Sequence, residues 1–149
     1  MQGYNGQIMV DTESQVIVSQ NATNSTSDAQ DLVPLLEGCK ENTGRHPGET
    51  LADTGYFSEA DLNEAGKDTE LFITTQNRWK LRKELAEKGP PRGRIPKPYG
   101  PREQMARKLR TKRGADAFMQ RNQVEAVLGQ MCMRSLNSFR LRSQEGPAG

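Results

Sequence analysis

The chain has 149 residues, of which 33% are hydrophobic and 5% aromatic, and its mean hydropathy is -0.85. This length fits one domain, but the apolar content is low for a self-sufficient globule, so part of the chain is expected to be exposed, disordered or short of a packing partner. The sequence excludes a membrane-spanning helix, which needs roughly 20 apolar residues, and it excludes a secretion signal, because MQGYNGQIMV lacks a basic region followed by an apolar stretch. We therefore expect a soluble intracellular protein.

Cysteine and histidine are too sparse for a disulfide framework or a zinc site. Cys39, Cys132 and the single histidine, His46, are far apart in the chain, without the paired spacing that zinc sites use. Packing positions are the simpler interpretation of both cysteines.

The small net charge of +2 conceals a strong asymmetry. Residues 1–77 carry 3 basic and 13 acidic side chains, residues 78–114 carry 14 and 3, and the remainder carries 4 and 3. A dense basic segment beside an acidic one suits a protein that binds phosphate with one part and cations with another. A solvated tail or linker explains the same charge equally well.

The first half of the chain predicts strands that alternate with helices. YNGQIMV and QVIVS alternate apolar and polar residues on either side of the polar turn DTES, which indicates a β-hairpin. Ser27 or Asp28 is the expected N-cap of the helix that follows, and Gly44 its stop. We expect strands at 4–10, 15–19, 49–52 and 71–74, and helices from about 31 to 43 and from about 58 to 64. This order favours an α/β fold, with helices packed against a mixed sheet.

The second half is basic and less regular. Residues 76–101 contain KGPPRGRIPKPYGP, where Pro and Gly among Lys and Arg indicate an exposed basic loop or insertion. Helical spacing returns at 102–113 through Met105 and Leu109, and continues at 115–133. We predict a core at 1–75, the insertion at 76–101, C-terminal helices of the same domain at 102–142, and a disordered tail at 143–149.

Two acidic residues occupy positions that suit a catalytic or metal site. Asp53 follows a short strand, and Glu125 is expected on an amphipathic helix among apolar neighbours. Binding sites collect at strand ends in open α/β sheets, and a helix that crosses this edge would bring Glu125 opposite Asp53. Taken singly, Asp53 has an ordinary alternative as a turn former, and Glu125 as a solvated helix side chain.

Several motifs, in this order, resemble those of DDE-type insertion-sequence transposases with an RNase H-like catalytic domain. They are GYNGQIMVD, NATNSTSDAQDLVPLLE, LADTGY, GRIPK, MARKLRTKRG, QRNQVEAVLGQM and FRLR, and they run from Gly3 to about Arg142. The resemblance implies a partial RNase H-like fold, in which a mixed β-sheet packs against helices and carries a basic Pro/Gly-rich insertion.

The same resemblance implies roles for the two acids. Asp53 corresponds to the second carboxylate of the DDE triad and Glu125 to the third, and both would ligate Mg2+ or Mn2+. The first Asp is expected on a strand before the hairpin, upstream of Gly3. Asp11, in the polar turn, is interpreted as a turn residue.

A family signature runs Tyr, two residues, Arg, three residues, Glu, six residues, Lys. In this chain the register reads Phe118, Arg121, Glu125 and Cys132. The aromatic residue lacks its hydroxyl and the lysine is replaced, and both missing groups are expected to contact DNA phosphate or the flanking ends.

DNA, as transposon ends and target, is the implied partner. The basic segment falls where the family places a DNA-facing insertion, and its Lys and Arg side chains would contact phosphate without sequence preference. Trp79 and Tyr99 are available to stack on unpaired bases, whereas packing against the sheet is the ordinary alternative for Trp79. The resemblance is also compatible with a homodimer and with a cytoplasmic, nucleoid-associated location in a bacterium. The expected DNA-binding residues are Arg92, Arg94, Lys97, Arg107, Lys108, Arg110, Lys112, Arg113 and Arg121.

Three functional hypotheses follow. In the first, the chain is a transposase fragment whose parent enzyme cleaves DNA and transfers strands, and which is inactive alone because the first Asp is missing. In the second, it is a non-catalytic basic protein that binds nucleic acid through residues 78–113. In the third, it has no function of its own and does not fold stably, since the hairpin lacks a neighbouring strand and leaves an edge open to aggregation.

Overall fold

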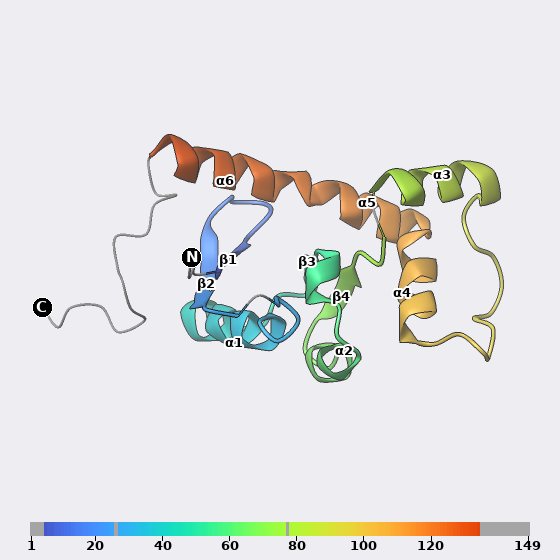
Figure 1. Cartoon of the computed structure of the whole chain (residues 1–149), viewed down its shortest axis with the longest axis horizontal. Coiled ribbons are helices and arrows are strands. Elements are labelled where there is room, and N and C mark those ends of the chain that lie inside the picture. Colours follow the sequence, from blue (N-terminus) through green and yellow to red (C-terminus); the bar gives the residue numbers. More distant parts are fainter. Residues whose placement is uncertain (1–4, 26, 77, 135–149) are drawn as a thin grey trace, which may run out of the picture.

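The computed structural model describes residues 5–134 except Thr26 and Asn77. Strands and helices alternate through the first half of this range, and helices alone make up the second half (Figure 1). The predicted tail at 143–149 lies outside the described residues. The elements are β1 (Asn5–Val10), β2 (Ile17–Thr23), α1 (Leu32–Thr43), β3 (Glu49–Ala52), the 3-10 helix η1 (Thr54–Tyr56), α2 (Glu59–Ala65), β4 (Glu70–Ile73), α3 (Arg78–Lys88), α4 (Pro101–Leu109), α5 (Lys112–Gln120) and α6 (Asn122–Met133).

Strands β1 and β2 form the predicted antiparallel hairpin, with Asn5 opposite Thr23 and Met9 opposite Ser19. The second strand begins later and runs further than predicted. The connecting turn is closed by Asp11, whose carboxylate accepts hydrogen bonds from the backbone N–H and the hydroxyl of Ser14. Asp and Ser form such local bonds readily, so the tight turn follows from the residues in it.

Helix α1 buries one face and ends where glycine allows it. Leu32, Leu35, Leu36 and Cys39 are buried. Gly44 adopts φ 80° and its N–H bonds to the Lys40 carbonyl, which is a left-handed helix stop that favours glycine.

The predicted cap of α1 at Ser27 or Asp28 is wrong. The residue at the N-cap position is Asp31, and its side chain makes no capping bond. Its carboxylate instead accepts hydrogen bonds from Gln7 and Asn21 on the hairpin. A contact between α1 and the sheet therefore replaces the local cap.

Strands β3 and β4 are parallel, with Leu51 opposite Phe72 and Ala52 opposite Ile73, and α2 forms the crossover between them. Phe72 and Ile73 are among the most deeply buried residues of the core, at 1% and 0% exposure. A short apolar run buried on both faces is typical of a parallel strand.

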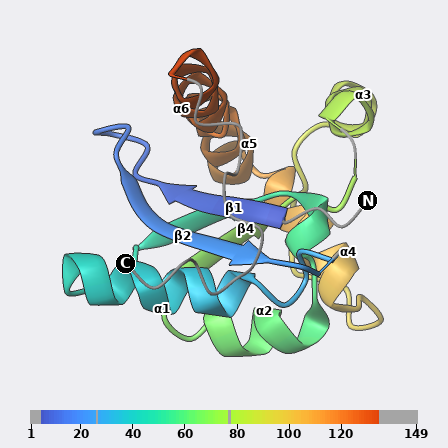
Figure 2. The same cartoon turned by 60° about the vertical axis from the view of Figure 1, so that its left-hand side comes forward.

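The strands lie between two layers of helices (Figure 2). Helices α1 and α2 cover one side, and the α5–α6 rod crosses the other side. The α/β class is thus confirmed. Among the described residues the strands form one antiparallel and one parallel pair, which are not hydrogen-bonded to each other. The main core cluster consists of Leu32, Leu36, Ala65, Leu71, Phe72, Ile73, Leu81, Met105, Leu109, Ala117 and Phe118.

Helix α3 occupies residues for which a loop was predicted. The sequence RWKLRKELAEK contains no Gly or Pro and is rich in strong helix formers. Leu81 anchors it in the core, and Lys83 pairs with Glu87 one turn later. The irregular basic loop is therefore limited to residues 89–100.

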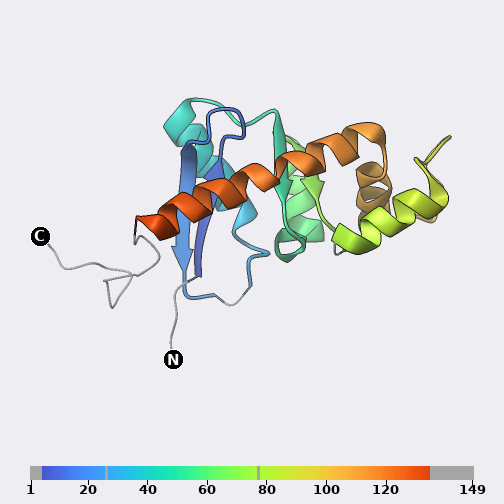
Figure 3. The ribbon, with the colours of Figure 1, turned by 90° about the horizontal axis from the view of Figure 1, so that it is seen from above.

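The single helix predicted for 115–133 is interrupted once, at Arg121. The Arg121 N–H bonds to the Phe118 carbonyl and the Val124 N–H to the Arg121 carbonyl, both with 3-10 spacing. Helices α5 and α6 nevertheless continue in nearly one direction (Figure 3).

Candidate functional site

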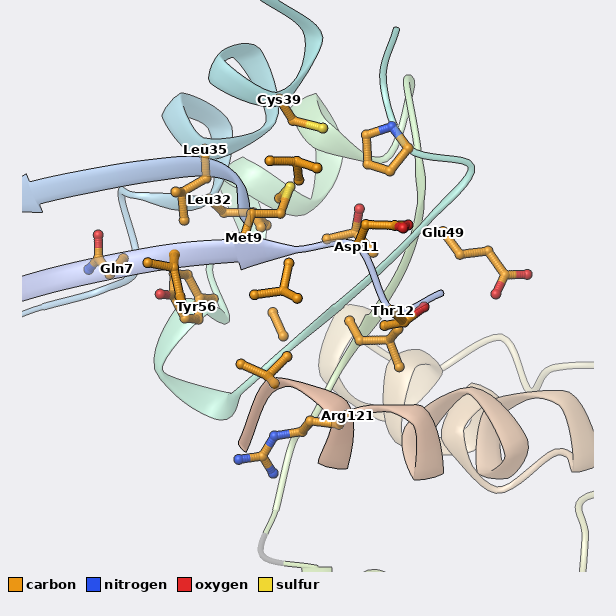
Figure 4. Close-up of a pocket in the computed structure, with 18 of the residues that line it drawn as sticks. Gln7, Met9, Asp11, Thr12, Leu32, Leu35, Cys39, Glu49, Tyr56 and Arg121 are labelled. Atoms are coloured by element: carbon orange, nitrogen blue, oxygen red, sulfur yellow. The ribbon is translucent and has the colours of Figure 1, made fainter. Parts of the chain in front are cut away.

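A cavity of about 890 Å³ lies between the hairpin and the β3–β4 pair. Strands β1 and β3 form its sides, and residues of α1 and of the α5–α6 junction close it. Figure 4 shows α1 side chains projecting into it near Met9, with Arg121 on the opposite helix. Both predicted acids, Asp53 and Glu125, line this cavity.

Asp53 is presented by the turn that follows β3. It has an extended backbone and precedes the 3-10 helix η1. The hydroxyl of Thr54 lies 3.0 Å from that of Thr74, which ties this turn to the end of the neighbouring strand. The Asp53 side chain is 51% exposed, and one of its oxygens accepts a hydrogen bond from the Arg121 guanidinium at 2.7 Å.

Glu125 is exposed on α6, one turn after Arg121, so the two side chains lie on the same face of the helix. This part of the prediction depended on a helix that crosses the end of β3. Arg121, at the junction of α5 and α6, contacts Asp53, so this pair of helices reaches the end of β3.

A complete metal site is not formed by these side chains. Within residues 5–134, with the two gaps already stated, no three His, Cys, Asp or Glu side chains are grouped closely enough to hold a metal ion. Asp53 and Glu125 supply carboxylate oxygens, which suit Mg2+ and Mn2+, but Arg121 already engages one of the Asp53 oxygens. The residues present therefore do not fit a two-metal centre by themselves.

A polar network beside Asp53 was missed by the sequence analysis. The side-chain amide of Gln7 donates to Asp28 at 2.9 Å and to Asp31 at 2.7 Å. Asn5 also donates to Asp28. A Cβ atom at Gly55 would lie only 2.9 Å from an Asp28 oxygen, so this carboxylate packs directly against the turn that carries Asp53.

The pKa of the Tyr56 phenol is raised by burial and by these acidic neighbours. Burial raises its pKa to about 12, and the negative charges of Asp28, Asp31 and Asp53 add to the effect. The glycine in LADTGY, two residues after Asp53, was the available signal, since glycine often marks a close approach of other groups to the backbone.

Asp11 is engaged in the hairpin turn. Hydrogen bonds from the Ser14 hydroxyl and N–H hold the pKa of its carboxyl below the usual range. Asp11 follows the end of β1, whereas Asp28 contacts Asn5 at its start. This position agrees with the prediction that Asp11 is a turn residue.

Besides Arg121, which pairs with Asp53, three of the predicted DNA-binding cations make internal contacts. Lys108 donates to the Leu71 carbonyl and pairs with Glu70 at 3.0 Å. Arg113 pairs with Glu49 and Glu70. The third, Arg107, donates to the backbone carbonyls of residues 92 and 93 at 2.8 Å each and so holds the basic loop.

The Lys108–Glu70 pair also covers the core, since the Lys108 ammonium lies 4.2 Å from the centre of the Phe72 ring. The hydrogen bond from Lys108, helped by its charge and that of Arg113, keeps the pKa of Glu70 low. These cations therefore have structural roles, whether or not they also approach phosphate.

Most of the other predicted cations are exposed. Arg92, Arg94 and Lys97 lie on the basic loop and Lys112 begins α5. Arg110 is half-buried, and its Nε is buried with no hydrogen-bond partner in the part of the chain that the structure describes.

The aromatic residues divide between surface and core. Trp79 is 61% exposed, so its predicted alternative of packing against the sheet is wrong, and Lys80 lies 5.6 Å from its ring centre. Tyr99 is half-buried. Phe118 belongs to the core at 8% exposure, which suits an aromatic ring without a hydroxyl, whereas Cys132 is exposed.

Among the described helices, none is long and apolar enough to cross a bilayer. The family model for the transposase DDE domain matches residues 1–147. Comparison with curated proteins and with solved structures gave no match.

Proposed function

Because the chain belongs to the transposase DDE domain family, we propose that it binds DNA through exposed basic side chains but does not by itself cleave DNA or transfer strands. The observation that carries this proposal is that Asp53 pairs with Arg121, and that among the described residues no three His, Cys, Asp or Glu side chains are grouped closely enough to hold a metal ion.

The chemistry of the proposed parent reaction explains why two acids are insufficient. Cleavage and strand transfer at a phosphodiester use two Mg2+ or Mn2+ ions about 3.5–4 Å apart, one for the attacking oxygen and one for the leaving oxygen. Both ions need oxygen ligands, including a carboxylate that bridges them. Asp53 and Glu125 supply only part of that set of ligands.

The proposed DNA surface is the basic loop together with the start of α5. Arg92, Arg94 and Lys97 are exposed on a loop whose backbone is held by Arg107. A loop whose backbone is already fixed loses less conformational entropy on binding, which favours contact with phosphate. Lys112 extends the same basic segment. Lys108 and Arg113 contribute less, because neighbouring glutamates already neutralise them.

Plasmid nicking tests the catalytic half of the proposal. We expect no nicking by the full chain in Mg2+ or Mn2+. Nicking that disappears in both Asp53→Ala and Glu125→Ala would overturn the proposed inactivity and assign these two carboxylates to the reaction.

DNA affinity measured by fluorescence anisotropy over a range of salt tests the binding half. The triple variant Arg92→Ala/Arg94→Ala/Lys97→Ala is expected to weaken binding of every duplex, and to lower the slope of log affinity against log salt by about one for each phosphate that the protein no longer neutralises. Lys40→Ala is the matched control, since Lys40 is exposed on α1 in the acidic half. Equal effects of the triple variant and the control would refute the assigned surface.

The variants Lys108→Ala and Lys112→Ala distinguish a structural role from a DNA-binding role. We expect this change to lower the melting temperature, because Lys108 bridges α4 to Glu70 and Leu71. Lys112→Ala is expected to leave the melting temperature unchanged and to weaken DNA binding.

A non-catalytic nucleic-acid-binding role, independent of transposition, is the second candidate. The exposed Arg92, Arg94 and Lys97 favour it. In that case affinity would be unaffected by Asp53→Ala and Glu125→Ala in either metal, whereas a residual transposase site would change its DNA affinity when these acids are removed.

A further inference from the structure

Two glutamates lie side by side at the amino end of the parallel strand pair. Glu49 begins β3 and Glu70 begins β4, and the two residues are directly opposite one another in the strand register. Like charges in such positions repel each other. This end of β3 is opposite to the end that carries Asp53, so the two glutamates are separate from the candidate site described above.

Two cations of the basic segment neutralise these glutamates. Helices α4 and α5 both lie beside β4 (Figure 1). One terminal nitrogen of Arg113, on α5, is 2.5 Å from an oxygen of Glu49 and 2.5 Å from an oxygen of Glu70. The Nζ atom of Lys108, on α4, lies 3.0 Å from the other oxygen of Glu70. Two positive and two negative charges cancel, so this cluster attracts an approaching anion only weakly.

The cluster is open to water. The side chain of Arg113 is 64% exposed, that of Glu49 40% and that of Glu70 34%. Ion pairs with this much exposure are weak, and salt screens them. An anion in solution can therefore reach Arg113 and compete with the glutamates for it.

The surroundings of the cluster favour phosphate as the competing anion. Lys112, which precedes Arg113, is exposed. Arg107, which precedes Lys108 on α4, holds the exposed basic loop. Carboxylate and phosphate oxygens both accept hydrogen bonds from a guanidinium in the same way, so a phosphate can take the place of the glutamates on Arg113. A polymer with closely spaced phosphates would contact the loop and this corner of α4 and α5 together.

We propose that Glu49 and Glu70 cover a second phosphate-binding surface, formed by Lys108, Lys112 and Arg113, and release Arg113 to the backbone of a nucleic acid that binds the adjacent basic loop. The two carboxylates limit the affinity, because a phosphate contact of Arg113 replaces contacts that the free chain already has. This role of the glutamates rests on the proposed DNA binding, to which it adds the residues that restrain its strength.

Removal of the two carboxylate charges tests this role. The variant Glu49→Gln/Glu70→Gln retains the size of both side chains and leaves Arg113 without an anionic partner in the cluster. Fluorescence anisotropy with a DNA duplex, over a range of salt, compares it with the unchanged chain. One added phosphate contact is expected to steepen the slope of log affinity against log salt by about 0.9, which is about eightfold tighter binding for each tenfold decrease in salt.

Glu13→Gln/Glu41→Gln is the matched control. It removes the same charge from two exposed positions, in the hairpin turn and on α1, and is expected to change the slope little. Arg113→Ala gives a second control. It is expected to have little effect on the unchanged chain but to remove the gain from the Glu49/Glu70 variant, because only that variant has a free Arg113. Such non-additivity is typical of residues in direct contact.

Two results would overturn the role of the glutamates: equal affinity of the Glu49/Glu70 variant and its matched control, or a gain that persists after Arg113→Ala. Failure of the proposed DNA binding would differ from both, since no form of the chain would then bind the duplex. In that case, elution from immobilised heparin, a polysulfate, decides the role of the glutamates. A higher elution salt for the Glu49/Glu70 variant than for the control would support it, and equal elution would contradict it.

Discussion

The carboxylate of Asp53 and the guanidinium of Arg121 lie 2.7 Å apart, although 68 positions separate them in the sequence. This ion pair fastens the end of β3 to the junction of α5 and α6. The charged partner of Asp53 in the cavity is therefore the cation Arg121 rather than another acid.

The Asp53–Arg121 pair is expected to contribute little to stability. Its side chains are 51% and 34% exposed, and pairs so exposed to water contribute about 0.2–1 kcal/mol. A double-mutant cycle of Asp53→Ala and Arg121→Ala, followed by urea unfolding, measures this coupling directly. A coupling above about 2 kcal/mol would mean that the pair is desolvated and holds the fold.

Gly114 is expected to be required for the contact between α4 and α5. A Cβ atom there would lie 2.2 Å from the Lys108 carbonyl oxygen and 2.8 Å from the Leu109 Cα, and both are backbone atoms that cannot easily move. We expect Gly114→Ala to reduce the free energy of unfolding by about 1–3 kcal/mol, as overpacking does.

Gly129→Ala is the matched control for Gly114→Ala. Gly129 is in the middle of α6, with nothing within 4 Å of its would-be Cβ. Alanine in an open helix position stabilises by about 0.5–1 kcal/mol relative to glycine. Destabilisation of both variants to the same extent would contradict the packing argument.

Asp31 is expected to be a structural residue that links α1 to the hairpin. It is 6% exposed and accepts hydrogen bonds from the amides of Gln7 and Asn21. Asp31→Ala removes the hydrogen bond to Asn21 and leaves the Gln7 amide with Asp28 alone, and the loss of such a partner costs about 1–3 kcal/mol for a buried group. Urea unfolding measures the loss, and Asp116→Ala, an exposed position on α5, should change stability by less than about 0.5 kcal/mol.

The titration of Tyr56 is expected to lower stability at high pH. Its pKa is raised from 10.0 to about 12, first by burial and then by the charges of Asp28, Asp31 and Asp53. A folded-state pKa above the unfolded value means that the stabilisation is complete below pH 10 and is lost as the pH rises towards 12. Urea unfolding of the chain and of Tyr56→Phe should diverge in this range and in no lower one.

Absorbance of tyrosinate gives an independent check on Tyr56. The difference titration between the chain and Tyr56→Phe is expected to have its midpoint well above 10.0, the ordinary pKa of tyrosine. A midpoint at the ordinary value would show that the phenol is solvated and that its acidic neighbours do not affect it.

Local sequence patterns predicted most elements of the first half. The alternation in YNGQIMV, the apolar face of α1 and the stop at Gly44 depend on neighbouring residues, and each appears in the structure. Helix α3 was not predicted, because the Pro/Gly-rich second half of residues 76–101 dominates the composition of that segment and masks the helix formers before it. The cap of α1 was misassigned because Asp31 bonds to strands distant in sequence.

The sequence by itself determined the two acidic positions, the basic segment and the family resemblance, since these depend on which residues occur and in which order. Only the tertiary structure decided their partners. It paired Arg121 with Asp53, and Lys108 and Arg113 with glutamates of the strands. It also separated β1 from β3 by a cavity. Such pairings join segments far apart in the chain, and their geometry is set by the packing of whole elements rather than by any local pattern.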